Sequence, residues 1–321
     1  MEAGNALKPN LDKGASRVSR IVKELKKNKV LYLMIAPGVL LKLVFAYIPL
    51  VGILIAFEDF NYKKGIFGSE WIGLENFKLF FSSGKMWMLT RNTLFYNILF
   101  IVTGTIFNII LAIVISEMCT RRYKRTLQSI MMLPHFLSWV IVGGMAYNIL
   151  NYEFGLLNNI LSSLGFDKID VYNNTGVWKY IFVVVSIWKE SGYGIIYYLA
   201  AITGINPELY EAARVDGCGI LQKIRYITLP MIKPTISILL LLRLGNILQG
   251  NMEMFYNLVG KNSYLYNATD VIDTYVYRTL MNLKDYGVTS AAGLYQNVIG
   301  FILVIVANQI TKKLDADSSL F

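Results

Sequence analysis

The chain has 321 residues, of which 55% are hydrophobic and only 16% charged, and its formal net charge is +10. This composition is more apolar and less charged than that of an ordinary soluble domain. It argues against a soluble enzyme, and it leaves the basic charge to be explained either by a nucleic acid partner or by membrane topology.

Six apolar runs are long enough to cross a bilayer as helices, which takes about 20 residues each. Two of these runs contain no charged residue, which argues against a soluble bundle of six buried helices. We therefore expect an all-α membrane protein with six transmembrane helices. Their expected bounds are Val30–Phe57, Thr93–Ser116, Ile130–Leu150, Val177–Ile202, Met231–Leu248 and Ser290–Ile310.

The distribution of lysine and arginine sets the expected orientation. With a cytoplasmic N-terminus, the inner segments hold about twice as many lysines and arginines as the outer segments, as the positive-inside rule requires. We therefore expect both termini in the cytoplasm and no nucleic acid partner. Residues 1–29 are expected to form a cytoplasmic basic segment against anionic lipid head groups. Residues 30–321 are expected to form one transmembrane domain, whose outer segment 250–289 contains a short helix at Asp270–Met281.

Proline interrupts three of the expected spans, at Pro37, Pro134 and Pro234. A proline inside a spanning helix frees a backbone carbonyl that a neighbouring group or water must satisfy. Each position is therefore expected to be either a packing kink or the border of a transport pathway.

The sequence offers few residues that could bind a metal, form a disulfide or act in catalysis. Two cysteines and one histidine, His135, provide no metal-ligand cluster. Cys119 and Cys218 both fall on the expected cytoplasmic side, so no disulfide is expected. The spans contain no catalytic constellation, which disfavours a membrane-embedded enzyme, and the absence of inverted repeats disfavours a self-contained secondary transporter. We expect no catalytic residue, metal site or cofactor in the chain, and a packing role for His135.

A polar segment with two glycines, residues 205–230, separates the fourth and fifth spans. Asn206 is a favourable N-cap residue and Pro207 suits the first position of a helix, which Gly217 would end. A second short helix is expected at Leu221–Thr228. The residues alone are equally consistent with an interfacial amphipathic loop that has no partner.

The same segment resembles the EAA loop of the permeases of type I ATP-binding-cassette (ABC) importers. That pattern joins Glu-Ala-Ala, a glycine four positions later and a distal Ile-x-Leu-Pro, which is Ile227–Pro230 here. One departure is Cys218, where the family commonly has alanine. The resemblance implies a coupling helix that docks on a cytosolic ATPase. Its implied contact residues are Glu211, Ala212, Ala213, Asp216 and Gly217.

Four stretches, Gly68–Phe77, Ile187–Gly217, Asp270–Leu280 and Gly293–Asn308, are similar to the carbohydrate-uptake branch of these permeases. Within this MalF- and UgpA-like branch, the sequence looks closest to the LplB-like group for oligosaccharides and aldouronates. The resemblance implies a permease of the bacterial plasma membrane that works with a second, homologous permease chain, a dimer of ATPase subunits and an extracellular solute-binding protein. The chain has no G-x-x-x-x-G-K-[ST] loop, so ATP and Mg are expected in the partner ATPase. A related type I importer for another small solute is the alternative.

Polar residues within the fourth and fifth spans are the candidates for a sugar site, because sugars are bound by hydrogen bonds and aromatic stacking. Glu190, Tyr193 and Tyr197 share one helical face, and a second stripe begins at Arg243. In maltose-type relatives the sugar lies on the helices that flank the EAA loop, which implies the same place here. A structural ion pair between Glu190 and Arg243 is the alternative. The expected sugar contacts are Lys189, Glu190, Tyr193, Tyr197, Arg243, Asn246, Gln249, Gly250 and Glu253.

Overall fold

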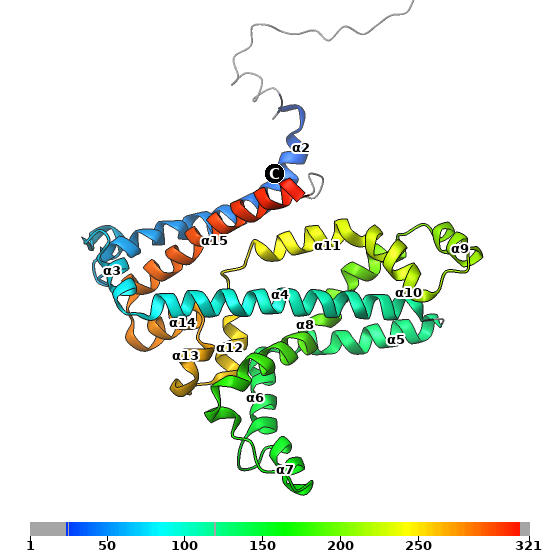
Figure 1. Cartoon of the computed structure of the whole chain (residues 1–321). Helices are drawn as coiled ribbons and strands as arrows, with labels where there is room; N and C mark the ends of the chain where they lie inside the picture. Colours follow the sequence, from blue (N-terminus) through cyan, green and yellow to red (C-terminus); the bar gives the residue numbers. More distant parts are fainter. Residues whose placement is uncertain (1–23, 25, 119, 315–321) are drawn as a thin grey trace, which may run out of the picture. The chain divides into compact units, whose positions relative to one another are not determined.

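A computed structural model of the chain describes Glu24, residues 26–118 and residues 120–314. It divides into two compact units, residues 1–54 and 55–321, which are described separately. The expectations for the basic segment 1–23, for Cys119 and for the two termini lie outside the described residues. Within them, helices dominate, as expected of an all-α membrane protein (Figure 1).

The first unit contains most of the first expected span, which continues past Leu54 to Phe57. It begins with α2 (Lys29–Lys42) and continues through the π-helical turn η1 (Leu43–Tyr47) into the 3-10 helix η2 (Ile48–Phe57). The run Lys29–Phe57 is long and apolar enough to cross a membrane. No side chain of α2 is buried, which suits a helix whose neighbour is lipid or another chain.

The second unit is built around α4 (Lys85–Glu117) and α8 (Trp178–Thr203), which pack along one another (Figure 1). α11 (Leu229–Leu244) contacts both, and α15 (Tyr286–Leu314) packs on α11. α4, α11 with the helical turns before it, and α15 are long and apolar enough to cross a membrane. The 26 residues of α8 span about 39 Å, which is also sufficient, although its charged and tyrosine residues make it more polar.

The third expected span, Ile130–Leu150, is not one unbroken helix. α5 (Arg121–Met132) and the 3-10 turn η4 (Leu133–Phe136) are followed by α6 (Trp139–Leu150), and the two helical parts are bent by 94° at the break. Pro134 lies in η4, and the hydroxyl of Ser138 accepts a hydrogen bond from a backbone N–H of α6 at 3.4 Å. A new helix therefore begins at Ser138.

The segment between α8 and α11 is only partly as expected. α9 (Pro207–Val215) is the first expected short helix, but the separate helix expected at Leu221–Thr228 is wrong. Instead α10 (Ile220–Lys223) passes through the π-helical turn η7 (Ile224–Thr228) into α11 without a break. Pro230 lacks the N–H of an ordinary helix residue, and the wider turn just before it accommodates the missing bond.

Short elements complete the second unit. The helix expected at Asp270–Met281 is confirmed as α14 (Ile272–Leu283). Two antiparallel strands pair Glu58 with Trp71 and Asp59 with Glu70. The remaining elements are β1 (Glu58–Asp59), η3 (Ile66–Gly68), β2 (Glu70–Trp71), α3 (Glu75–Ser82), α7 (Leu156–Ser163), η5 (Val171–Asn173), η6 (Thr175–Val177), α12 (Met252–Val259), η8 (Ser263–Leu265) and α13 (Tyr266–Thr269).

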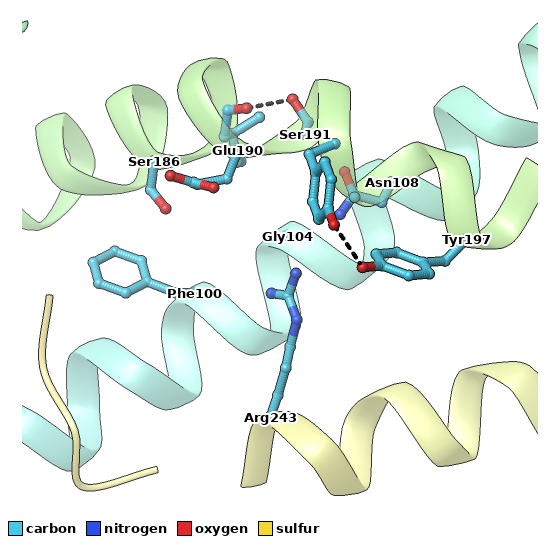
Figure 2. Close-up of a pocket in the computed structure, with 11 residues that line it drawn as sticks. Phe100, Gly104, Asn108, Ser186, Glu190, Ser191, Tyr197 and Arg243 are labelled. Carbon is cyan, nitrogen blue, oxygen red and sulfur yellow. Dashed lines mark hydrogen bonds between the residues drawn. The ribbon is translucent and has the colours of Figure 1, made fainter. Parts of the chain in front are cut away.

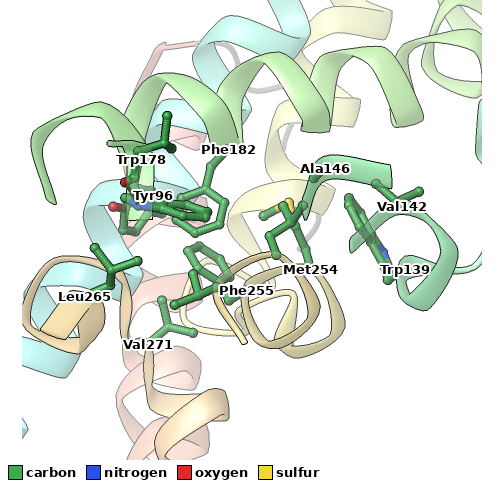
Figure 3. Close-up of a cluster of buried hydrophobic side chains, with 13 residues drawn as sticks. Tyr96, Trp139, Val142, Ala146, Trp178, Phe182, Met254, Phe255, Leu265 and Val271 are labelled. Carbon is green, nitrogen blue, oxygen red and sulfur yellow. Dashed lines mark hydrogen bonds between the residues drawn. The ribbon is translucent and has the colours of Figure 1, made fainter. Parts of the chain in front are cut away.

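Buried side chains gather at two ends of α8. Near its start, an aromatic cluster joins α4, α6, α8 and α12 (Figure 3), and the rings of Phe182 and Phe255 are 4.4 Å apart. Toward its end, an aliphatic cluster that includes Ile195, Ile202 and Ile232 joins α4, α8 and α11 beside α9. Dispersion and burial hold the three long helices together at these clusters. The middle part of α8 lies between these two clusters.

Candidate functional site

A cavity of about 340 Å³ lies between α4, α8 and α11, in the middle part of α8 (Figure 2). We call it the central cavity. Its α8 wall carries Glu190, Tyr193 and Tyr197, the stripe expected from helical spacing. Arg243 reaches into it from α11, as Figure 2 shows. The structure therefore brings four of the nine expected sugar-contact residues into one cavity.

A neighbouring cavity of about 400 Å³ shares Gly194, Tyr197 and Arg243 with the central cavity. Two more of the expected residues, Asn246 and Gln249, line it. The two cavities are adjacent and share these walls, and we call them together the recess. Six of the nine expected residues thus line this recess.

Glu190 has a partner in the second unit, and it is His135 rather than Arg243. Oε2 of Glu190 lies 3.2 Å from Nδ1 of His135, which belongs to η4. The alternative ion pair between Glu190 and Arg243 is not found among the described residues. Glu190 stays accessible, since 41% of its side chain is exposed.

Aromatic rings continue this wall. The ring of Tyr193 stacks on that of His135, with centroids 4.9 Å apart and planes 8° apart. The hydroxyl of Tyr197 donates to the hydroxyl of Tyr193 at 3.2 Å. Both tyrosines remain exposed, at 45% and 44%. A flat ring with a carboxylate beside it suits the stacking and hydrogen bonding that a saccharide requires.

Glycines allow the cavity wall of α4 to approach α8 and α11. A Cβ on Gly104 would lie 3.4 Å from Nη1 of Arg243, and a Cβ on Gly194 would overlap the side-chain amide of Asn108. Oδ1 of Asn108 is buried and has no hydrogen-bond partner within the described chain. A buried acceptor of this kind normally receives a hydrogen bond, so a ligand hydroxyl or water suits this position.

Lys189 does not line the recess. It is 4% exposed, its Nζ donates to the backbone oxygen of His135 at 2.9 Å, and it lies 5.1 Å from the ring centre of Trp139. Consecutive helix residues point about 100° apart, so Lys189 faces the break between η4 and α6 while Glu190 faces the cavity. Its observed contacts are structural.

Gly250 and Glu253 also lie outside the recess: α11 ends at Leu244, and of the expected residues after it only Asn246 and Gln249 line the recess. The backbone N–H of Gly250 donates to Oδ2 of Asp273 at 2.6 Å, and a Cβ at Gly250 would be 2.8 Å from that oxygen. Glu253 is exposed in the first turn of α12, where a carboxylate is favoured by the helix dipole.

The prediction from charged and aromatic residues missed the other lining residues of the recess, most of which come from α4 and α8. The apolar run of α4 contains no charged residue that would have pointed to the recess. A usable signal was present, since Asn97, Gly104 and Asn108 recur at spacings of seven and four residues on one helical face. The missed lining residues are Asn97, Phe100, Ile101, Gly104, Asn108, Ser186, Ile187, Ser191, Gly194, Tyr198, Leu239 and Leu242.

α9 has defined ends of its own. The side chain of Asn206 accepts a hydrogen bond from the backbone N–H of Glu208 at 3.1 Å. Gly217 follows the helix with φ of +73°, and the N–H of Cys218 donates to the oxygen of Ala213 at 2.9 Å. A left-handed glycine with this bond is the common way to close a helix C-terminus. The local sequence therefore determines the length of α9.

The implied coupling residues do not all face the same way. Ala213 is 7% exposed and packs toward the body of the unit, whereas Glu211, Ala212, Asp216 and Gly217 are exposed. The hydroxyls of Tyr210 and Thr228 are 3.0 Å apart and tie α9 to the start of the fifth span. α9 thus offers an exposed surface and is fastened to the helices that carry the recess.

Comparison with known proteins identifies the family of the chain. Residues 104–315 match the family described as binding-protein-dependent transport system inner membrane component. The chain is 38% identical over 297 residues to the polygalacturonan/rhamnogalacturonan transport system permease protein YteP of Bacillus subtilis, covering 92% of this chain and 91% of that protein. It is 38% identical over 293 residues to Protein LplB of the same organism, covering 91% and 92%.

A solved structure is similar over nearly the same length. One chain in the crystal structure of a bacterial alginate ABC transporter, in complex with an alginate pentasaccharide-bound periplasmic protein, superposes with a TM-score of 0.83. The two chains are 36% identical, and the match covers 92% of this chain and 98% of that one. The all-α fold, its apolar helices and these matches lead to one conclusion: the chain belongs to the binding-protein-dependent transport system inner membrane components, the multi-pass permeases of ABC transporters.

Proposed function

We propose that this chain is a permease subunit of an ABC importer for oligosaccharides and that the central cavity contacts the sugar. The observation that carries the proposal is the grouping of Glu190, Tyr193, Tyr197 and Arg243 around one cavity. Aromatic faces with hydrogen-bonding groups between them are the chemistry that binds sugar rings. The relatives named for polygalacturonan and alginate support the same substrate class.

The size and walls of the recess suit a polar substrate inside a membrane. Its two parts, about 340 and 400 Å³, fall within the range of small-molecule sites. Polar groups within spans are costly and are kept mainly where they serve a function. The walls come from α4, α8, α11 and the turn after α11, so a second, homologous permease chain is proposed to close the open side.

α9 is proposed as the contact with a cytosolic ATPase dimer, which holds ATP and Mg. Its exposed Glu211, Ala212, Asp216 and Gly217 supply the contact, and Ala213 supports it from beneath. A displacement of α9 would be transmitted to the helices that line the central cavity. α10 and Arg243 belong to one continuous helical run, Ile220–Leu244, and α8 leads back from α9 to Glu190.

The assembly is proposed to work in the bacterial plasma membrane and to receive its sugar from an extracellular solute-binding protein. The test is reconstitution of the chain with its partner permease, ATPase and binding protein in liposomes, followed by uptake and ATPase assays over a panel of oligosaccharides. Import of at least one oligosaccharide is expected. Stimulation only by another class of small solute would contradict the sugar assignment.

The coupling role is tested in the same assay. Glu211→Lys is expected to lower uptake and ligand-stimulated ATPase activity at least about tenfold, because the reversed charge opposes docking. Glu153→Lys, a charge reversal at an exposed position outside α9, is the matched control and should leave both rates unchanged. Membrane insertion should be equal in both. Normal uptake with Glu211→Lys would remove the coupling role from α9.

A further inference from the structure

A separate pocket of about 300 Å³ lies at the ends of α4 and α8 that are opposite to α9; we call it the distal pocket. We propose that the distal pocket binds the carboxylate of an acidic sugar residue, so that the substrates are oligosaccharides that contain uronates. This inference rests on the proposed function of oligosaccharide import. The distal pocket is lined by Arg91, Asn92, Phe95, Tyr96, Thr175 and Lys179.

Two cations face the distal pocket without a carboxylate to neutralise them. No acidic residue lines it, and the ion pairs found among the described residues involve neither Arg91 nor Lys179. The nearby Asp270 is already engaged by Arg278 and by the hydroxyl of Thr274. The distal pocket therefore keeps a local positive charge that an anion would balance.

Arg91 is held in place by a buried amide. Asn92 is 5% exposed, and its Nδ2 donates to the backbone oxygens of Asn267 at 3.1 Å and Asp270 at 3.0 Å. Its oxygen is thereby directed at Arg91, whose Nη2 donates to it at 3.3 Å. The guanidinium has five donors in a fixed plane, so most remain free for a bidentate carboxylate.

The other walls suit a sugar ring rather than a bare anion. Phe95 is 47% exposed and offers a ring face. The hydroxyl of Tyr96 donates to the backbone oxygen of Ala268 at 2.8 Å, which fixes its ring. Thr175 adds a hydroxyl that can donate or accept. A carboxylate on a peptide needs only the cations, whereas a uronate uses the cations, the ring face and the hydroxyl.

One face of α8 connects the distal pocket with the central cavity. Lys179, Ser186 and Glu190 are separated by seven and four residues, so they project from the same side of the helix. Lys179 and Glu190 are about 16 Å apart along the helix axis, at 1.5 Å per residue. A single sugar ring is shorter than this distance, so only an oligosaccharide could occupy both sites.

The test measures binding to the purified complex in nanodiscs, without the binding protein, by titration calorimetry. The probes are trigalacturonate and its trimethyl ester, which has nearly the same shape but no charge. Arg91→Gln and Lys179→Gln are each expected to raise the Kd for trigalacturonate about tenfold, the usual effect of one lost charge-assisted contact. Neither should change the Kd for the ester. Lys168→Gln is the matched control. Lys179 lies over the ring of Tyr180 and Lys168 lies over the ring of Tyr152, but Lys168 is outside the distal pocket.

The outcomes separate the two proposals. If the wild-type complex binds trigalacturonate and the two variants bind it equally well, the distal pocket is not a uronate site. If both variants instead lose affinity for the sugar-loaded binding protein and keep the same preference for acid over ester, the two cations serve protein docking and the inference is overturned. If no sugar-loaded binding protein stimulates the wild-type ATPase, the proposed function itself is wrong.

Discussion

Nδ1 of His135 lies 3.2 Å from Oε2 of Glu190, and the backbone oxygen of the same histidine accepts a hydrogen bond from Nζ of Lys189 at 2.9 Å. Two adjacent residues of α8 therefore hold one residue of η4 from two sides. His135 lies just before the 94° bend between η4 and α6. The bend and the cavity wall are consequently parts of one arrangement: Lys189 secures the backbone at the bend, and Glu190 with Tyr193 places the imidazole beside the cavity.

Glu190→Gln is expected to weaken sugar handling without unfolding the protein. The amide retains the shape of the carboxylate but accepts weaker hydrogen bonds, so the KM for the best oligosaccharide should rise about tenfold, or about 1.4 kcal/mol. The measurement is uptake into reconstituted liposomes over a sugar panel. Glu253→Gln is the control, because Glu253 lies outside the recess. Equal KM values and sugar preferences in all three proteins would show that the cavity is not the sugar site.

Lys189→Met is expected to act on stability. The change retains the length of the side chain but leaves the backbone oxygen of His135 without its donor, which should cost about 1–3 kcal/mol. The readout is the thermal unfolding midpoint in detergent. Lys179→Met, at an exposed position of the same helix, should leave that midpoint unchanged. An unaltered midpoint in Lys189→Met would contradict the structural role assigned here.

Gly192→Ala tests the contact between α5 and α8. An added Cβ at Gly192 would overlap the backbone oxygen of Met131, and a backbone atom cannot move aside as a flexible side chain can. Overpacking of this kind costs about 1–3 kcal/mol, so the unfolding midpoint should fall. Gly144→Ala is the matched control, since it lies in α6 with nothing within 4 Å of its added Cβ. It should be neutral or slightly stabilising, by up to about 1 kcal/mol, because alanine favours the helix.

Asp273→Asn tests a pH dependence outside the spans. Burial raises the pKa of Asp273 above its ordinary value of 3.8, and the hydrogen bonds from Gln296 and from the N–H of Gly250 only partly oppose the shift. The folded protein therefore favours the protonated carboxyl. Its stabilising contribution is complete below pH 3.8 and is lost as the pH rises through the raised pKa.

The asparagine variant lacks this ionisation, so its Tm relative to wild type should increase as the pH is raised above 3.8. The measurement is a series of thermal melts in detergent across the acid range. Asp167→Asn removes an exposed carboxylate and should give a Tm difference that does not change with pH. A constant Tm difference for Asp273→Asn would show that its carboxyl is not destabilised by burial.

Much of the fold follows from local signals in the sequence. The apolar runs predict the positions of α4, α8 and α15 because burial in lipid acts on each run separately. α9 is predicted because its cap residues, Asn206 and Gly217, satisfy its own backbone ends. The face shared by Glu190, Tyr193 and Tyr197 follows from helical geometry alone. These features need no knowledge of any distant part of the chain.

Tertiary structure decided the rest, because it depends on groups far apart in the sequence. The break after η4 is secured by Lys189, 54 positions from the oxygen that it binds. α11 ends at Leu244, so the expected stripe does not continue as a helix to Glu253, and Asn97 holds the turn after α11 by donating to the oxygens of Ile247 at 3.0 Å and Gln249 at 3.3 Å. Periodicity gives the direction in which a side chain points, but only the packed helices determine what it meets there.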